Sequence, residues 1–137
     1  MSLVLDASMS ITWLFEDEHT PNALALFRRV AEEGAVVPSL WRLEVANALR
    51  AAVRRRRCEE PFVDRSLLRL DRLPIAIDTE TDAHAWGMTR ALSREEDLTL
   101  YDAAYLELAL RLDRPLASND TDLIDAARRR GIEVLGR

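Results

Sequence analysis

Short apolar runs alternate with longer segments of helical periodicity along this chain. The runs that predict strands are residues 3–6, 35–38, 74–78, 115–118 and 132–135. The segments with apolar residues at helical spacing are 10–15, 21–33, 40–56, 61–73, 81–93, 100–112 and 121–130. Buried strands that alternate with helices favour a parallel sheet covered on both faces. We therefore predict an α/β fold of three layers, α/β/α, with a central parallel sheet of four to five strands.

Several of the predicted helices carry capping signals. Thr20 precedes a proline in the first turn of the helix that Gly34 ends. Ser39 is predicted to cap the helix at 40–56, and Thr99 is predicted to cap the helix at 100–112. These caps place helix starts close behind strands, at the carboxyl edge of the sheet, where open α/β folds place their functional sites.

The length of 137 residues suits one compact domain, so a single domain over residues 1–137 is expected. No apolar run reaches the roughly 18 residues of a membrane span, and the N-terminus does not resemble a signal peptide. The single Cys58 cannot form an internal disulfide, which favours a cytoplasmic location.

The chain contains no lysine, so all 19 basic residues are arginine. This excludes a Walker A phosphate loop and Schiff-base chemistry, because both require a lysine. It also excludes phosphotransfer domains that depend on a lysine beside their aspartate. The net charge of −5 does not indicate a general nucleic-acid-binding surface, although local arginine clusters could contact phosphate.

Four acidic residues lie in apolar or strand-end contexts where a charge is unfavourable unless it is compensated. Asp6 ends the first strand, and Asp120 follows the fourth strand. Glu44 lies within the apolar stripe of the helix at 40–56, and Asp102 heads an apolar face of the helix at 100–112. If the fold brings them together, they repel one another or bind a cation.

Each acid also has a purely structural explanation. Asp6 and Asp120 stand at helix starts and could serve as N-caps, and Glu44 could pair with a buried arginine. Asp102 has the spacing of a capping box with the Thr99 cap. Asp122 could exchange roles with Asp120, because it lies only two residues further on.

Converging carboxylates favour Mg²⁺ or Mn²⁺, which prefer oxygen ligands. Such ions can activate water and stabilise the departing oxygen of a phosphodiester. Zinc is not favoured, because His19 lies in a polar turn and His84 is expected on a helix surface. Asn47, one turn after Glu44, could orient a water or a carboxylate.

Taken in order, four stretches resemble PIN-domain ribonucleases and, among these, the VapC toxins of bacterial toxin–antitoxin pairs. They are VLDASMSITWLFEDE, VPSLWRLEVANAL, LTLYDAAYLELAL and PLASNDTDL, which together cover nearly the whole chain. The resemblance implies that Asp6, Glu44, Asp102 and Asp120 bind the metal. It makes Asn47 and Ser118 supporting residues and Asp122 an additional candidate ligand; the family more often has threonine where this chain has Ser118.

The resemblance also implies a PIN-like fold and Mg²⁺- or Mn²⁺-dependent hydrolysis of RNA by water, without a covalent intermediate. It implies a homodimer and a cognate VapB-like antitoxin, in a heterotetramer or larger complex, whose tail enters or covers the acidic cleft. An arginine of that partner could pair with the carboxylates in place of the metal. A PIN nuclease of RNA processing or decay, and a non-catalytic acidic binding module, remain alternatives.

The sequence leaves several features open. The runs at 54–57 and 128–130 either complement helix dipoles or contact RNA backbone. Trp13, Trp41 and Trp86 are expected in the core, with Trp41 alternatively at the rim of the cleft. The RNA that is cleaved, the number of metals at rest and the identity of the antitoxin are not predicted.

Overall fold

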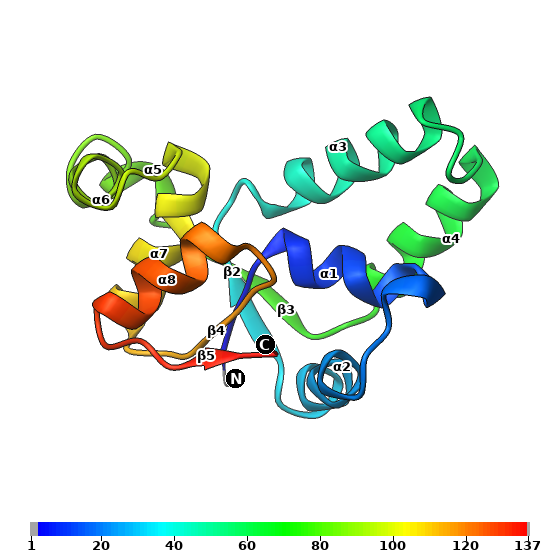
Figure 1. The fold of residues 1–137 in the computed structure, drawn as a ribbon, viewed down its shortest axis with the longest axis horizontal. Coiled ribbons are helices and arrows are strands. Elements are labelled where there is room, and N and C mark those ends of the chain that lie inside the picture. The colour runs from blue at the N-terminus through cyan, green and yellow to red at the C-terminus, as the bar shows by residue number, and fades with distance from the viewer. Residues whose placement is uncertain (1–2, 137) are drawn as a thin grey trace.

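The computed structural model describes residues 3–136, which form a parallel sheet between two layers of helices (Figure 1). The strands are β1 (Val4–Leu5), β2 (Ala35–Val37), β3 (Ile75–Ile77), β4 (Leu116–Ala117) and β5 (Val134–Leu135). They lie in the order β3-β2-β1-β4-β5, and all neighbouring pairs are parallel. The predicted α/β fold with a central parallel sheet is therefore confirmed.

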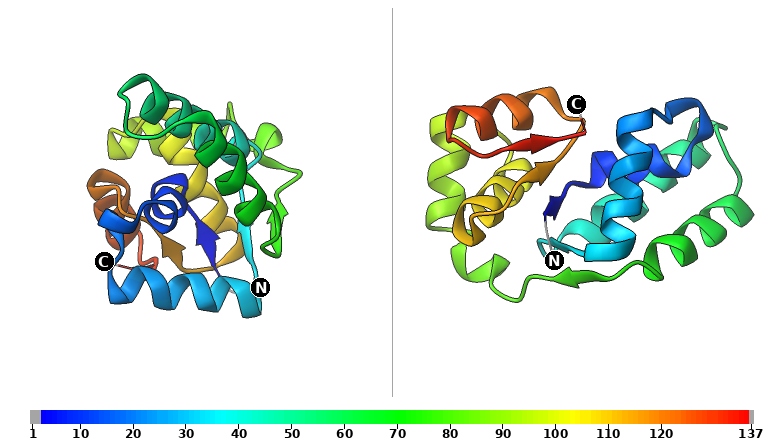
Figure 2. Two further views of the ribbon diagram at one scale, coloured as in Figure 1. Left: turned by 90° about the vertical axis from the view of Figure 1, so that its right-hand side faces the viewer. Right: turned by 90° about the horizontal axis from the view of Figure 1, so that it is seen from below.

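The helices divide between the two faces of the sheet, as Figure 2 shows from two further directions. One layer holds α1 (Ala7–Leu14), the 3-10 turn η1 (Glu16–Glu18), α2 (Pro21–Glu33), α3 (Trp41–Arg54) and α4 (Glu60–Asp71). The other holds α5 (Thr81–His84), α6 (Met88–Glu96), α7 (Leu100–Leu112) and α8 (Thr121–Arg129). The chain winds outward from β1 to β3, then returns to add β4 and β5 on the other side of β1.

Helix α7 is the central element of its layer. It packs against α6, α8, β1 and β4, and its residues 103–109 are all buried. A helix that is apolar on nearly every side fits this position, because neighbours cover most of its surface. The first turn of α7 is consequently held in a fixed place above the middle of the sheet.

Two predicted local features differ from the structure. The segment 81–93 is not one helix, because it is divided into α5 and α6 by a turn that contains Gly87. Ser39 does not cap α3; the cap position is Leu40, and the backbone N–H of Ser39 donates to the hydroxyl of Thr81. Thr20 and Thr99 do accept the predicted capping hydrogen bonds.

Of the three tryptophans, two follow the prediction. Trp13 and Trp41 are buried in the core, and the indole of Trp41 donates to the hydroxyl of Ser10. Trp86 is 89% exposed, so its assignment to the core was wrong. The turn that separates α5 from α6 turns this side chain outward, a break that helical periodicity did not reveal.

The arginine runs form ion pairs with nearby carboxylates. Arg57 contacts Asp17 and Glu18 and lies 3.7 Å above the ring of Phe15. Residues Arg129 and Arg130 both contact Glu96, and Arg130 also contacts Glu95. These pairs give Arg57, Arg129 and Arg130 a structural role that neither sequence alternative included.

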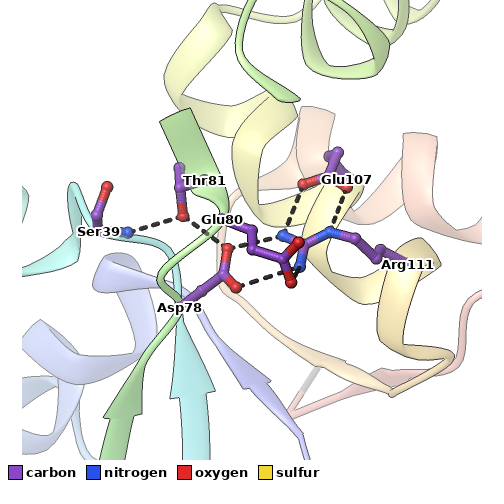
Figure 3. A network of polar contacts seen from close by, with 6 residues as sticks. All are labelled: Ser39, Asp78, Glu80, Thr81, Glu107 and Arg111. Atoms are coloured by element: carbon purple, nitrogen blue, oxygen red, sulfur yellow. Dashed lines mark hydrogen bonds and ion pairs between the residues drawn. The ribbon is translucent and has the colours of Figure 1, made fainter. Parts of the chain in front are cut away.

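A buried ionic network joins α7 to the segment after β3 (Figure 3). Arg111 donates to Glu107 at 2.8 Å and to Asp78 at 2.7 Å, with Glu80 3.7 Å away. Burial alone would raise the pKa of Asp78, but hydrogen bonds from Arg111 and Thr81 outweigh burial and lower it. The network fixes the carboxyl-terminal half of α7 against the sheet.

None of the helices in residues 3–136 has both the length and the apolar character needed to span a membrane.

Candidate carboxylate site

The middle of the sheet brings two of the predicted acids together. Asp6 directly follows β1, and Asp120 lies just beyond β4, the neighbour of β1. The chain reverses its winding direction between these two strands, which is the topological switch point where open α/β sheets form their binding crevices. The position of both aspartates therefore follows from the strand order.

The other two acids project from helix starts. Glu44 lies in the first turn of α3, and Asp102 lies in the first turn of α7. The first turn is a favourable place for a carboxylate, since the helix dipole is positive there. The site thus receives its acids from four separate segments of the chain.

Asp6 is the most deeply buried of the four acids, with 4% of its surface exposed. Its Oδ2 accepts hydrogen bonds from the hydroxyls of Ser8 at 2.6 Å and Ser118 at 2.7 Å. Its side chain makes no capping hydrogen bond to α1. Burial raises the pKa of Asp6, the two serine hydroxyls lower it, and the charge of Asp120 raises it. The N-cap explanation of Asp6 therefore does not hold.

Glu44 on α3 makes a hydrogen bond with a residue of α7. Its Oε1 accepts a hydrogen bond of 2.6 Å from the phenol of Tyr105. Burial raises the pKa of Glu44, the Tyr105 hydrogen bond lowers it, and the charges of Asp6 and Asp120 raise it. Among the described residues no arginine pairs with Glu44, so the alternative of a buried ion pair is not realised there.

Asp120 and Asp102 combine a helix-start position with a place in the site. Asp120 Oδ1 accepts from the backbone N–H of Leu123 at 2.9 Å, so Asp120 is the N-cap of α8. The backbone N–H of Asp102 donates to Thr99 Oγ1 at 3.1 Å. Burial, then the charges of Asp120, Asp6 and Glu44, raise the pKa of Asp102 to about 7. A position at a helix start is therefore compatible with a place among the four coupled carboxylates.

Every pairing among Asp6, Glu44, Asp102 and Asp120 contributes to these pKa shifts. The four predicted carboxylates are consequently close enough to repel one another, at the carboxyl edge of the sheet beside the first turns of α3 and α7. Within residues 3–136, no ion pair joins a cation to any of the four. The concentration of negative charge is the main electrostatic property of this site.

The donor chemistry fits a hard divalent cation, because all four side chains offer carboxylate oxygens. In the described part of the chain, however, no three acidic, histidine or cysteine side chains lie together closely enough to form a complete ligand set. The coupling of the four acids and the absence of a close ligand group among the described residues are consistent, since electrostatic repulsion acts over a longer distance than metal coordination. The four acids therefore share one neighbourhood at separations larger than those of a common ligand shell.

The supporting residues fall into two groups. Ser118 is fully buried and donates to Asp6, and it also accepts from the backbone N–H of Asp120 at 3.0 Å. Asn47 is exposed on α3, one turn after Glu44, and its predicted role has no contact to support it. Asp122 is exposed and lines a different small hollow, beside Glu96, Asp97, Asp125 and Arg129.

Two site residues were not identified as such from the sequence. Tyr105 lies one turn after Asp102 on the same face of α7, so helical spacing contained a signal for it. Ser8, two residues after Asp6, could be interpreted from the sequence only as a possible helix cap, but its hydroxyl donates to Asp6 Oδ2. In both cases the hydroxyl donates to one of the four carboxylates.

Comparisons with known proteins agree with this fold. The family model described as "PIN domain" matches residues 3–129. No curated protein sequence matches the chain. One similar solved structure is PAE2754 from Pyrobaculum aerophilum, with 19% identity, a TM-score of 0.68, and coverage of 98% of this chain and 89% of that chain. Another is FitAcB from Neisseria gonorrhoeae, with 14% identity, a TM-score of 0.66, and coverage of 97% and 96%.

Proposed function

This chain belongs to the PIN-domain family, and on that basis we propose that it is a Mg²⁺- or Mn²⁺-dependent endoribonuclease. PIN domains are generally metal-dependent nucleases. The single observation that carries the proposal is that Asp6, Glu44, Asp102 and Asp120, from four separate segments, lie near enough for their charges to raise the pKa values of the first three. A set of four carboxylates with no paired cation in the described residues is suited to a divalent ion and not to an ordinary structural role.

In this proposal the four carboxylates would hold the metal, and the metal would supply activation of a water and stabilisation of the departing oxygen of the phosphodiester. The chain's own contribution is to fix the carboxylates. Ser8 and Ser118 orient Asp6, and Tyr105 orients Glu44 through its hydroxyl. Because carboxylate ligands must lose their protons, metal affinity should rise as the pH rises through the raised pKa of Asp102, about 7.

Cleavage in solution tests the enzyme proposal directly. Purified protein should cut single-stranded RNA with Mg²⁺ or Mn²⁺ and not with EDTA, and a DNA of the same sequence tests the preference for RNA. Asp102→Asn should abolish cleavage, whereas Asp64→Asn, an exposed acid on α4, should retain it. Cleavage that persists in EDTA, or in Asp102→Asn, would refute a carboxylate-held metal.

We further propose that the protein is the toxin of a toxin–antitoxin pair, inhibited by a VapB-like partner and assembled as a homodimer. An apolar groove of about 470 Å³ between α3 and α4, with Trp41, Val45, Leu67 and Leu70 in its lining, supports a helical partner. Expression with and without the adjacent gene, with RNA ends mapped in arrested cells, tests this role. Growth arrest that persists in Asp6→Asn would argue against nuclease toxicity.

The alternatives remain distinguishable. A nuclease of RNA processing or decay would also cleave RNA with a divalent metal. Its expression would not cause a growth arrest that co-expression of the neighbouring gene relieves. A non-catalytic acidic module would bind a basic partner but would leave RNA intact with every divalent ion. The mass of the purified protein in solution, alone and with its partner, measures the proposed homodimer and the heterotetramer or larger complex.

A further inference from the structure

A second hollow lies directly beside the carboxylate site, on the side of α1. Its volume is about 600 Å³, within the range of roughly 300–1,000 Å³ typical of small-ligand pockets. It is formed by α1, η1, α3 and the loop after β4, and it is lined by Ser8, Ile11, Thr12, Glu18, Ala48 and Asn119.

The hollow adjoins the carboxylates through two of its walls. Ser8 belongs to both the hollow and the carboxylate site, because it lines the hollow and donates to Asp6. Ala48 lies one turn after Glu44 on α3, so the two side chains share one face of that helix. A molecule bound in the hollow would therefore lie next to whatever is held between Asp6 and Glu44.

The lining combines apolar walls with hydrogen-bond acceptors. Ile11 and Ala48 supply apolar surface. The Thr12 hydroxyl donates to the carbonyl of Ser8 at 3.2 Å and accepts from Asn119 Nδ2 at 2.7 Å. The Ser8 hydroxyl donates to Asp6 and accepts from the backbone N–H of Asn119 at 2.9 Å. Since each hydroxyl has a single hydrogen, only lone pairs remain available on these two oxygens.

Glu18 adds to this acceptor character. It lies at the η1 end of the hollow and is 2.7 Å from Arg57, and its carboxylate can only accept hydrogen bonds. Since Arg57 offsets the charge of Glu18, it is the nearby carboxylate site that makes the hollow unfavourable for a phosphate group. A flat, uncharged ring that donates hydrogen bonds at its edge is the better occupant.

We propose that this hollow binds the nucleobase next to the scissile phosphate and that it selects bases with an exocyclic amino group. This inference rests on the proposed ribonuclease function. Adenine, cytosine and guanine can donate from an exocyclic amino group with two hydrogens, whereas uracil has only its N3–H, flanked on both sides by carbonyl oxygens that the acceptors repel. Sequence-selective proteins generally recognise unpaired RNA bases in this way, by contact with the ring and hydrogen bonds to its edge.

The test is a variant that fills the hollow without touching a carboxylate. Ala48→Phe places a ring in it, and Ala48→Leu is a smaller change for use if the first variant does not fold. Ala46→Phe is the matched control, because it makes the same substitution on α3 but lines the groove toward α4. Folding of each variant is checked by its unfolding midpoint.

Each protein is given a random-sequence RNA pool, and the cleaved ends are sequenced. The wild type and Ala46→Phe should show uracil depleted at one position beside the cut. Ala48→Phe should lose that preference, and its kcat/KM should fall roughly 10-fold, the size expected for losing about one hydrogen bond to the base. A substrate without a base at that position should lower wild-type kcat/KM by a similar factor and leave the variant little changed.

The outcomes separate this inference from the ribonuclease proposal. If the wild type cleaves no RNA with any divalent ion, both fail. If the wild type cleaves but the folded Ala48 variants keep its base preference, or if uracil is enriched at that position, the base site alone is overturned. A variant altered only in its inhibition by a protein partner would also overturn it, since the hollow would then serve that partner.

Discussion

Replacing Asp102 with asparagine should stabilise the metal-free protein at neutral and alkaline pH. Burial and three neighbouring carboxylates raise the pKa of Asp102 from its ordinary value of 3.8 to about 7. Asparagine keeps the shape of the side chain but removes the charge that these surroundings oppose. The variant should therefore lose activity and gain stability at the same time, which is the pattern of a residue strained for function.

The size of the effect follows from the pKa. One pKa unit corresponds to about 1.36 kcal/mol, so the rise from 3.8 to about 7 gives roughly 4 kcal/mol before screening. Asp102 is only partly buried, and solvent screening reduces this to about 2 kcal/mol. The folded protein binds this proton more tightly than the unfolded chain does. Wild-type stability therefore falls as the pH rises from about 4 to about 7 and then levels off.

Urea unfolding in EDTA measures this difference. The stability advantage of Asp102→Asn should be small near about pH 4 and should reach about 2 kcal/mol above about pH 7. The control Asp64→Asn, at an exposed position on α4, should show no such pH dependence. Two results would refute mutual repulsion among the four carboxylates. One is an Asp102→Asn protein that is less stable than wild type at alkaline pH, and the other is a stability advantage that does not change with pH.

Two further substitutions test the contacts that hold the site. The Tyr105 hydroxyl donates to Glu44 and lowers the pKa of that carboxyl. Tyr105→Phe removes the hydroxyl, so the pKa of Glu44 should rise and the acidic limb of the pH–rate profile should move to higher pH. The free energy of unfolding should fall by about 1 kcal/mol, and an unchanged profile would contradict this role. Arg111→Met leaves Glu107 and Asp78 buried without their cation, so urea unfolding should show a loss of about 3–5 kcal/mol at neutral pH. Since the pairing lowers the pKa of Asp78, that loss should shrink in acid; a loss below about 1 kcal/mol would show that the network is not structural.

Local signals in the sequence predicted most of the fold. Thr20, Thr99 and Gly34 act where they were expected, because a cap depends only on residues within one turn. Ser39 is not the cap, because α3 begins one residue later, and its backbone N–H instead donates to Thr81, 42 residues away. Local reasoning thus succeeded where the partner is near in sequence and failed where it is distant.

The candidate site shows the same limit. The positions of Asp6 and Asp120 could be predicted, since strand ends in an α/β sheet converge on one edge. The hydroxyl partner of each carboxylate could not be predicted, because Tyr105 is 61 residues from Glu44 and Ser118 is 112 residues from Asp6. Which hydroxyl orients which carboxylate depends on the packing of α3, α7 and the loop after β4.

Glu107 shows why an acid in an apolar segment is an incomplete signal. Like Glu44, it interrupts a run of buried residues, and only 3% of its surface is exposed. It pairs with Arg111 one turn further on, however, and has a structural role. Glu44 has Ala48 at the equivalent position and accepts only from a neutral phenol in the described contacts. A cation one turn away on the same helix face therefore distinguishes an acid with a structural ion pair from one without, and that criterion can be read from the sequence alone.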